Sequence, residues 1–297
     1  MADTDPISPL FGRVLTAMVT PFNADGSVDY EEAALLAQHL AAHGSDGLVV
    51  AGTTGESPTL TTDEKIRLFH AVRAAVGKEV KVLAGTGSNN TAETIVLSRE
   101  AQHLGVDGLL VVTPYYSRPP QSGVLAHFRA VADSADLPVM LYDIPKRSGV
   151  PIDTETLLAL AEHDRIVGVK DAKGDLIASS QVIAETELEF WAGDDAALLP
   201  MLSVGGVGVV GTSTHFCGRE TKQLIEAFLR GDSAEALRVH QQLLPIFTGI
   251  FRTAGTILTK AGLRERGLDV GGVRLPLVDA TDHELSHLRQ DLAAAGL

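Results

Sequence analysis

The chain has 297 residues, of which 45% are hydrophobic and 21% charged, so it can build the core of one large domain or two ordinary ones. Its net charge of -14 argues against nucleic acid or an anionic membrane as a partner, because a negative surface repels polyanions. Cys217 is the single cysteine and no Cys/His cluster has metal-ligand spacing, so we expect a reducing compartment, no internal disulfide and no metal.

The start of the chain predicts a cytoplasmic protein. Residues 1–6 are acidic and no apolar segment follows them, unlike a secretory signal. Residues 196–217 contain no Asp, Glu, Lys or Arg over 22 positions, which is long enough to span a membrane. Pro200, several glycines and the polar residues 212–215 favour instead a short helix, a turn and a buried strand. We therefore expect no membrane association.

Short apolar, β-branched runs recur along the chain and predict eight strands. They are residues 14–20, 47–52, 80–87, 108–114, 139–145, 166–172, 189–194 and 207–212. Segments with apolar residues at helical spacing lie between them, for example 30–43, 63–76, 91–104 and 153–163. This alternation predicts an α/β fold, a (β/α)8 TIM barrel, with an open doubly wound sheet as the alternative.

After the eighth strand the pattern changes to helices alone. They are predicted near residues 220–229, 234–251, 255–266 and 283–295. We therefore predict a catalytic barrel over 1–231 and a C-terminal helical region over 232–297. No Pro/Ser-rich linker separates the two, so this region should pack on the barrel or on a neighbouring subunit.

Lys170 places an amine at the end of the predicted buried strand 166–172. A free lysine has a pKa of roughly 10.4, and loss of solvent at an apolar strand end lowers it, which allows the amine to attack a carbonyl and form a Schiff base. Taken alone, a lysine there more often simply reaches water.

Other polar side chains follow the same ends of neighbouring strands, where active sites of this fold lie. They are Thr53 and Thr54, Tyr115 and Tyr116, and Tyr142 and Arg147. Each of these residues, taken alone, can also be explained as a turn residue, a packing aromatic or a surface charge. Together they suit imine chemistry on a keto acid, since hydroxyls pass protons, while the Arg147 fork and the backbone N–H groups of residues 53–55 can bind carboxylates.

Four segments, at residues 51–57, 112–116, 141–149 and 168–172, resemble the dihydrodipicolinate synthase family. They read Ala-Gly-Thr-Thr-Gly-Glu-Ser, Val-Thr-Pro-Tyr-Tyr, Leu-Tyr-Asp-Ile-Pro-Lys-Arg-Ser-Gly and Gly-Val-Lys-Asp-Ala, and the resemblance runs from about Gly12 to the C-terminus. It implies a cofactor-free lyase of diaminopimelate and lysine biosynthesis. Its substrates would be pyruvate and L-aspartate 4-semialdehyde, condensed through a Schiff base on Lys170.

The resemblance also implies a role for each site residue. Tyr142 would be the acid/base partner of the imine on Lys170, with Thr53 and Tyr116 completing a hydroxyl relay. Thr54 would bind the pyruvate carboxylate through its backbone and Arg147 the carboxylate of the semialdehyde, while Gly193 and Val210 would line the pocket. In this family the Tyr116 position reaches into a neighbouring subunit's site, which implies a homotetramer built as a dimer of dimers.

The sequence departs from the family pattern at three places. Residues 208–212 read Gly-Val-Val-Gly-Thr where Gly-Val-Ile-Ser-Val is usual, and Asp171 stands where many members have Glu. Members inhibited by lysine often have histidines at the positions of Thr62 and Lys65 and a small residue at Pro58. We therefore predict weak or no lysine feedback, although Asn89 and Glu93 match other parts of that regulatory site.

Two alternatives remain from the sequence. Sibling lyases for sialate, keto-deoxy sugars or hydroxy-oxoglutarate share the lysine and tyrosine, but a cation at Arg147 and the Thr53-Thr54 pair favour the synthase. A non-catalytic barrel that binds keto acids is the second alternative. The combination of Lys170, Tyr142 and Thr53 argues against it, because a binding protein needs neither a nucleophile nor a proton relay.

Overall fold

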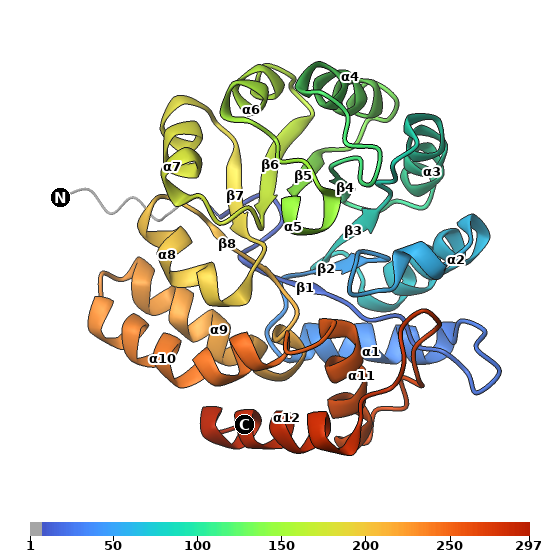
Figure 1. Cartoon of the computed structure of the whole chain (residues 1–297), viewed down its shortest axis with the longest axis vertical. Coiled ribbons are helices and arrows are strands. Elements are labelled where there is room, and N and C mark those ends of the chain that lie inside the picture. The colour runs from blue at the N-terminus through green and yellow to red at the C-terminus, as the bar shows by residue number, and fades with distance from the viewer. Residues whose placement is uncertain (1–7) are drawn as a thin grey trace.

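The computed structural model describes residues 8–297 and contains a closed barrel of eight parallel strands (Figure 1). The acidic residues 1–6 lie outside the described part. Each strand pairs with the next one along the chain, and β8 returns to pair with β1. This closure confirms the predicted (β/α)8 barrel and excludes the open sheet.

The strands are β1 (Val14–Ala17), β2 (Gly47–Val50), β3 (Lys81–Gly85), β4 (Gly108–Val112), β5 (Val139–Asp143), β6 (Ile166–Asp171), β7 (Glu189–Ala192) and β8 (Gly208–Gly211). The α-helices that follow or precede them are α1 (Tyr30–Ala42), α2 (Thr62–Val76), α3 (Thr91–His103), α4 (Gln121–Ala132), α5 (Pro145–Ser148), α6 (Thr154–Ala161), α7 (Leu176–Glu185), α8 (Leu198–Ser203) and α9 (Thr214–Leu229). Two short 3-10 helices, η1 (Ser57–Thr59) and η2 (Asp195–Ala197), lie in the loops after β2 and β7.

Most strands end one to three residues before their predicted carboxyl ends. The second, for example, ends at Val50, and Ala51 already has a φ of 54°. At these positions the chain leaves the ladder to form loops, so the apolar pattern extends beyond the hydrogen-bonded strand. These loops carry most of the polar residues that the sequence singles out.

The hydrophobic core has two layers. Inside the barrel, side chains from alternate strand positions fill the centre, among them Leu15, Val49, Met140 and Trp191. A larger outer cluster lies between the strands and the surrounding helices. Because strand residues alternate between these layers, each strand fixes which of its side chains can reach the barrel interior.

Residues 196–217 form α8, a turn, β8 and the start of α9, as the glycines and Pro200 predict. No helix within residues 8–297 is long and apolar enough to cross a membrane. The helix α9 begins at Thr214 rather than near residue 220. Its first turn is buried and kinked at Cys217, which has a φ of -133° and a ψ of 33°. The buried polar side chains of this turn hid its helical character from the sequence pattern.

The remaining helices are α10 (Ser233–Gly249), α11 (Gly255–Glu265) and α12 (Asp282–Ala295), coloured orange to red in Figure 1. Helix α10 packs on α9 and α12. Lys260 of α11 forms an ion pair at 2.9 Å with Glu56, which follows β2, and both side chains are fully buried. The C-terminal helices are thus attached to a loop at the carboxyl end of the barrel.

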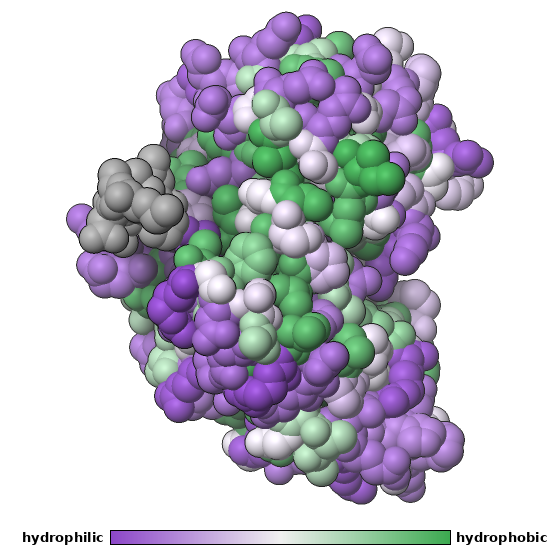
Figure 2. All heavy atoms as spheres, turned by 90° about the vertical axis from the view of Figure 1, so that its left-hand side faces the viewer, coloured by the Kyte–Doolittle hydropathy of each residue, from purple (hydrophilic) through white to green (hydrophobic). Residues whose placement is uncertain are grey.

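Figure 2 shows the side of the molecule that is on the left in Figure 1, where α7, α8 and α10 lie. Apolar residues gather across the middle of this face, between hydrophilic regions above and below. Ile177 of α7 is 86% exposed.

Candidate active site

Lys170 and Tyr142 face each other inside the carboxyl end of the barrel. They are paired in register across β6 and β5, so their side chains share one face of the sheet. The Lys170 Nζ lies 4.3 Å from the centre of the Tyr142 ring, and both residues are only 5% exposed. A buried amine is thereby held against a buried phenol.

Burial lowers the pKa of Lys170 to about 8. The Asp195 carboxylate opposes this shift in pKa, and the positive charge of Arg147 adds to it. Near neutral pH a useful fraction of the amine is therefore uncharged and able to attack a carbonyl.

Burial raises the pKa of Tyr142 to about 12, with partial opposition from Arg147 and from a side-chain hydrogen bond with Thr53. The phenol therefore keeps its proton at physiological pH. A protonated hydroxyl beside Lys170 can donate to, and accept from, groups that form on that amine.

The loop after β2 presents backbone donors to the same region. Glu56 has a φ of 58°, and a Cβ at Gly55 would lie 3.0 Å from the Met18 carbonyl oxygen, so the loop passes close to β1. The Thr20 hydroxyl donates to the Gly55 carbonyl at 2.6 Å and holds the loop there. Within residues 8–297, the N–H group of Thr54 has no hydrogen-bond acceptor. A free N–H at a buried turn is suited to an anionic ligand.

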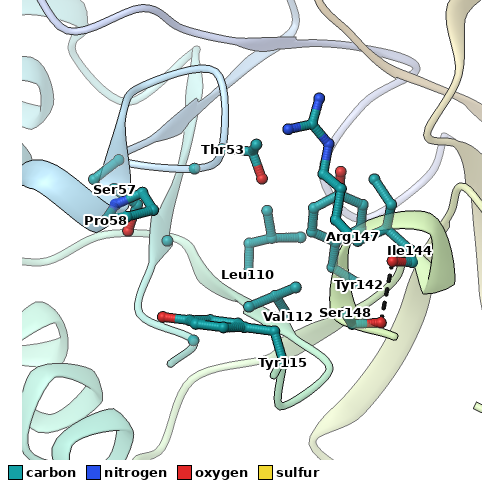
Figure 3. Close-up of a pocket in the computed structure, with 14 residues that line it drawn as sticks. Thr53, Ser57, Pro58, Leu110, Val112, Tyr115, Tyr142, Ile144, Arg147 and Ser148 are labelled. Carbon is teal, nitrogen blue, oxygen red and sulfur yellow. Dashed lines mark hydrogen bonds between the residues drawn. The ribbon is translucent and has the colours of Figure 1, made fainter. Parts of the chain in front are cut away.

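A cavity of about 360 Å³ opens between Tyr142 and the loop after β2 (Figure 3). Its lining includes Thr53, Leu110, Tyr115, Tyr142, Arg147 and Ser148. Arg147 extends from α5 over Tyr142, and Thr53 points into the same space from the opposite wall (Figure 3). Its guanidinium makes no ion pair within the described part of the chain. An unpaired cation beside a mainly apolar cavity is a suitable carboxylate binder.

The remaining predicted site residues lie less directly at this cavity. Thr54 is 8% exposed and lines a smaller crevice that adjoins it, together with Thr53 and Arg147. Val210 lies in the inner core with Tyr142, and Gly193 donates its N–H to the Asp171 carbonyl at 2.7 Å. Val210, Gly193 and Lys170 are not among the residues that line the 360 Å³ cavity in a single chain.

Tyr116 does not line the cavity in a single chain. It is 90% exposed and has a φ of 71°, in a loop where Arg118 also has a positive φ of 49°. A strained loop that holds an aromatic ring away from its own barrel requires some other contact to account for it.

Asp171, one of the departures from the family pattern, lies outside the cavity. It follows Lys170 on β6 and therefore points to the opposite face, where the Ser179 hydroxyl of α7 donates to its carboxylate. Its shorter side chain therefore changes the strand–helix contact rather than the pocket.

Asp195 is a residue that the sequence analysis missed. It is 1% exposed at the start of η2 and interacts electrostatically with Lys170. Its carboxylate also accepts hydrogen bonds from the N–H groups of Thr212 and Ser213, after β8. The available signal was an acidic pair, Asp194-Asp195, directly after an apolar strand.

Among the described residues, no group of three His, Cys, Asp or Glu side chains is arranged to hold a metal ion.

Comparisons with known proteins all identify the same family. Residues 10–295 match the Dihydrodipicolinate synthetase family. A 4-hydroxy-tetrahydrodipicolinate synthase from Acidothermus cellulolyticus is 61% identical over 286 residues, 96% of this chain and 93% of that protein. Another from Streptomyces coelicolor is 53% identical over 100% of this chain and 99% of its own length. The crystal structure of a dihydrodipicolinate synthase from Cyanidioschyzon merolae with lysine bound superposes with a TM-score of 0.96 at 47% identity, covering 98% of this chain and 100% of that one.

Proposed function

The chain belongs to the dihydrodipicolinate synthetase family, and we propose that Lys170 is the amine through which it forms 4-hydroxy-tetrahydrodipicolinate. The reaction condenses pyruvate with L-aspartate 4-semialdehyde, on the route to diaminopimelate and lysine. The observation that carries the assignment is the buried Lys170 amine, with its pKa lowered to about 8, against the Tyr142 ring.

The steps follow from the chemistry of an amine and a keto acid. Lys170 adds to C2 of pyruvate, and loss of water from the carbinolamine gives an imine. Loss of a proton from C3 then gives an enamine, whose C3 forms a bond to the aldehyde carbon of the semialdehyde. Finally, the amino group of the bound semialdehyde attacks C2, closes the ring and releases Lys170 as a free amine.

Tyr142 is the proposed proton donor and acceptor for these steps, since it keeps its proton at neutral pH and contacts Lys170. Thr53 is proposed to continue the relay, because its side chain interacts with that of Tyr142. Thr54 is the proposed site for the pyruvate carboxylate, because its backbone N–H is free. Val210 and Gly193 are proposed to form the wall of the pocket.

The third hydroxyl of the relay, Tyr116, is proposed to come from a neighbouring subunit. Its exposure and its left-handed backbone support this proposal, because its N–H donates to the Ser148 carbonyl of its own chain at 3.3 Å while its side chain is 90% exposed. We propose a homotetramer in which one contact places Tyr116 and a second uses the side formed by α7, α8 and α10, where apolar residues gather (Figure 2).

Arg147 is proposed to select the second substrate by binding the carboxylate of the semialdehyde. Sugar acceptors such as N-acetylmannosamine offer hydroxyls there, which do not need a cation. The 51–61% identity to several 4-hydroxy-tetrahydrodipicolinate synthases also favours this activity over that of the sibling lyases.

A coupled assay tests this assignment. The wild-type protein should turn over pyruvate with L-aspartate 4-semialdehyde and not with N-acetylmannosamine. Arg147→Ala should raise the KM for the semialdehyde roughly 10- to 100-fold, as expected for loss of a charge-assisted contact, and leave the KM for pyruvate nearly unchanged. Lys146→Ala removes an exposed neighbouring charge and is the matched control. Equal use of both acceptors, or an unchanged semialdehyde KM in Arg147→Ala, would contradict the assignment.

A further inference from the structure

The side chain of Thr54 contacts a residue at which this sequence departs from the family pattern. Its Oγ1 lies 3.1 Å from the Oγ1 of Thr212, directly after β8, and Thr212 is 5% exposed. Valine is usual at that position in the family. The contact therefore joins the loop after β2 to the end of β8 by a hydroxyl pair that valine cannot make.

The backbone of Thr212 is fixed from both sides. Its N–H donates to both carboxylate oxygens of Asp195, each at 3.1 Å. Its carbonyl oxygen lies 2.8 Å from the Nδ1 of His215. His215 is buried, and burial lowers its pKa to about 4, so the ring is neutral. The Nδ1–H of this neutral ring donates to the Thr212 carbonyl. The Thr212 side chain therefore extends from a rigid support.

Gly211 belongs to the same arrangement. A Cβ at this position would lie 2.6 Å from the Oδ1 of Asp195 and 2.9 Å from the Cγ2 of Thr214. A serine, which is usual there in the family, does not fit while Asp195 binds the backbone of Thr212. The two changed positions, 211 and 212, are thus coupled through one carboxylate.

Thr54 is held from a second direction as well. The Thr256 hydroxyl of α11 donates to the Thr54 carbonyl at 3.1 Å. With its carbonyl and its side chain both bound, the free polar groups of Thr54 are its N–H and the remaining hydrogen-bonding capacity of its hydroxyl. In the described residues, Thr54 is also the only hydrogen-bond partner of the Thr212 hydroxyl. If Thr212 donates, the Thr54 proton is free to point towards a ligand.

We propose that Thr212 is a positioning residue for pyruvate: its hydroxyl fixes the Thr54 side chain so that Thr54 presents both its N–H and its O–H to the pyruvate carboxylate. The inference rests on the proposed function, in which Thr54 binds that carboxylate. It adds a specificity-determining contact that the family pattern does not contain. Pyruvate keeps its carboxylate from binding to ring closure, so the contact acts equally in the ground and transition states and should appear in KM rather than in kcat.

The test replaces the hydroxyl with a methyl group. Thr212→Val is nearly isosteric and should raise the KM for pyruvate about 3- to 10-fold, the effect of one lost hydrogen bond, with kcat changed by less than about twofold. Thr212→Ser keeps the hydroxyl and should stay close to wild type. The KM for the semialdehyde should not change, and the melting temperature of each variant confirms that it folds.

A double-mutant cycle tests whether Thr212 acts through Thr54. In a Thr54→Val background, which removes the Thr54 hydroxyl, adding Thr212→Val should change the pyruvate KM by less than about 1.5-fold. An unchanged KM in Thr212→Val, equal impairment in Thr212→Ser, or the full effect in the Thr54→Val background would each overturn the proposal. A Thr212→Val protein that does not fold would also contradict it, because the role would then be structural.

A separate experiment distinguishes failure of the proposed function from failure of the role of Thr212 alone. Borohydride reduction in the presence of pyruvate should label Lys170 in the wild type, half-saturating at a pyruvate concentration that Thr212→Val shifts upward about 3- to 10-fold. Absence of labelling in the wild type would reject the proposed function, whereas labelling with no shift in Thr212→Val would reject only the role of Thr212.

Discussion

The ε-amine of Lys170 combines two properties that a nucleophile needs at neutral pH. Its pKa of about 8 leaves roughly one amine in ten uncharged at pH 7, against fewer than one in a thousand for an unperturbed lysine. The Tyr142 ring packs against the amine, and its phenol stays protonated. Lys260 shows that a lowered pKa alone does not make a lysine a nucleophile. Burial also lowers the pKa of Lys260 to about 8, but its ammonium group is bound to Glu56 and fully enclosed.

Lys65 gives a physical reason to expect weak feedback by lysine. The side chain is half-buried, and burial lowers its pKa while the Glu93 carboxylate opposes the shift. Lys65 and Glu93 both stand at positions that match the regulatory site of lysine-inhibited members, and they interact electrostatically, so the Lys65 cation would repel the ammonium group of an incoming lysine.

We therefore expect the rate of the coupled assay to be unchanged by millimolar L-lysine at subsaturating pyruvate. Potassium chloride at the same concentration controls for ionic strength. Clear inhibition by L-lysine that the salt does not reproduce would show that the Lys65 ammonium does not block the site.

At the level of strands and loops, the pairing of β5 with β6 places Tyr142 opposite Lys170 and sends Asp143 and Asp171 to the outer face. The loop after β2 is then held by contacts from distant segments. Lys260 pairs with Glu56, and the backbone N–H of Arg274 donates to the other carboxylate oxygen of Glu56 at 2.9 Å. The C-terminal helices thereby support the loop that carries Thr53 and Thr54.

Loss of one partner of this buried pair should be costly. Lys260→Met leaves the Glu56 carboxylate buried without its cation, and we expect the free energy of unfolding to fall by about 3–5 kcal/mol. The double variant Lys260→Met/Glu56→Gln should recover part of that loss, because it buries no uncompensated charge.

Denaturant unfolding of the wild type, the two single variants and the double variant measures the coupling energy between Lys260 and Glu56. The control is Lys78→Met, a change at an exposed lysine. A single variant Lys260→Met as stable as the Lys78→Met control would mean that the pair does not anchor the loop.

The sequence was informative wherever local pattern and strand order determine position. Alternating apolar strands and helices predicted the barrel, and the rule that strand ends meet at one face brought Thr53, Tyr142, Arg147 and Lys170 together. Asp195 was missed because its importance depends on the loop after β8, which lies next to it only in the folded chain. The buried pair of Lys260 with Glu56 spans more than two hundred residues and leaves no local signal. The division into 1–231 and 232–297 stays a prediction.

For the whole molecule, two exposed features remain unexplained by a single chain. Tyr116 extends from a strained loop, and Ile177 of α7 is 86% exposed. Both fit the proposed homotetramer, in which the first supplies a hydroxyl to a neighbouring site and the second is covered by another copy.

Subunit mixing tests whether Tyr116 acts across the interface. Lys170→Met and Tyr116→Phe should each lower activity strongly as homo-oligomers. A heterodimer of the two should regain about half of the wild-type activity, because one of its two sites then combines an intact Lys170 with a partner's intact Tyr116. Light scattering gives the oligomeric state of each preparation. No gain of activity in the mixed dimer would indicate that the tyrosine serves its own chain.

The most direct test of the central claim is borohydride trapping with pyruvate, followed by peptide mass analysis. We expect a pyruvate-derived mass increment on Lys170 alone, formed faster as the pH rises through about 8, because the amine must lose its proton before it attacks. No increment on Lys170, or one on Lys260 instead, would contradict the account.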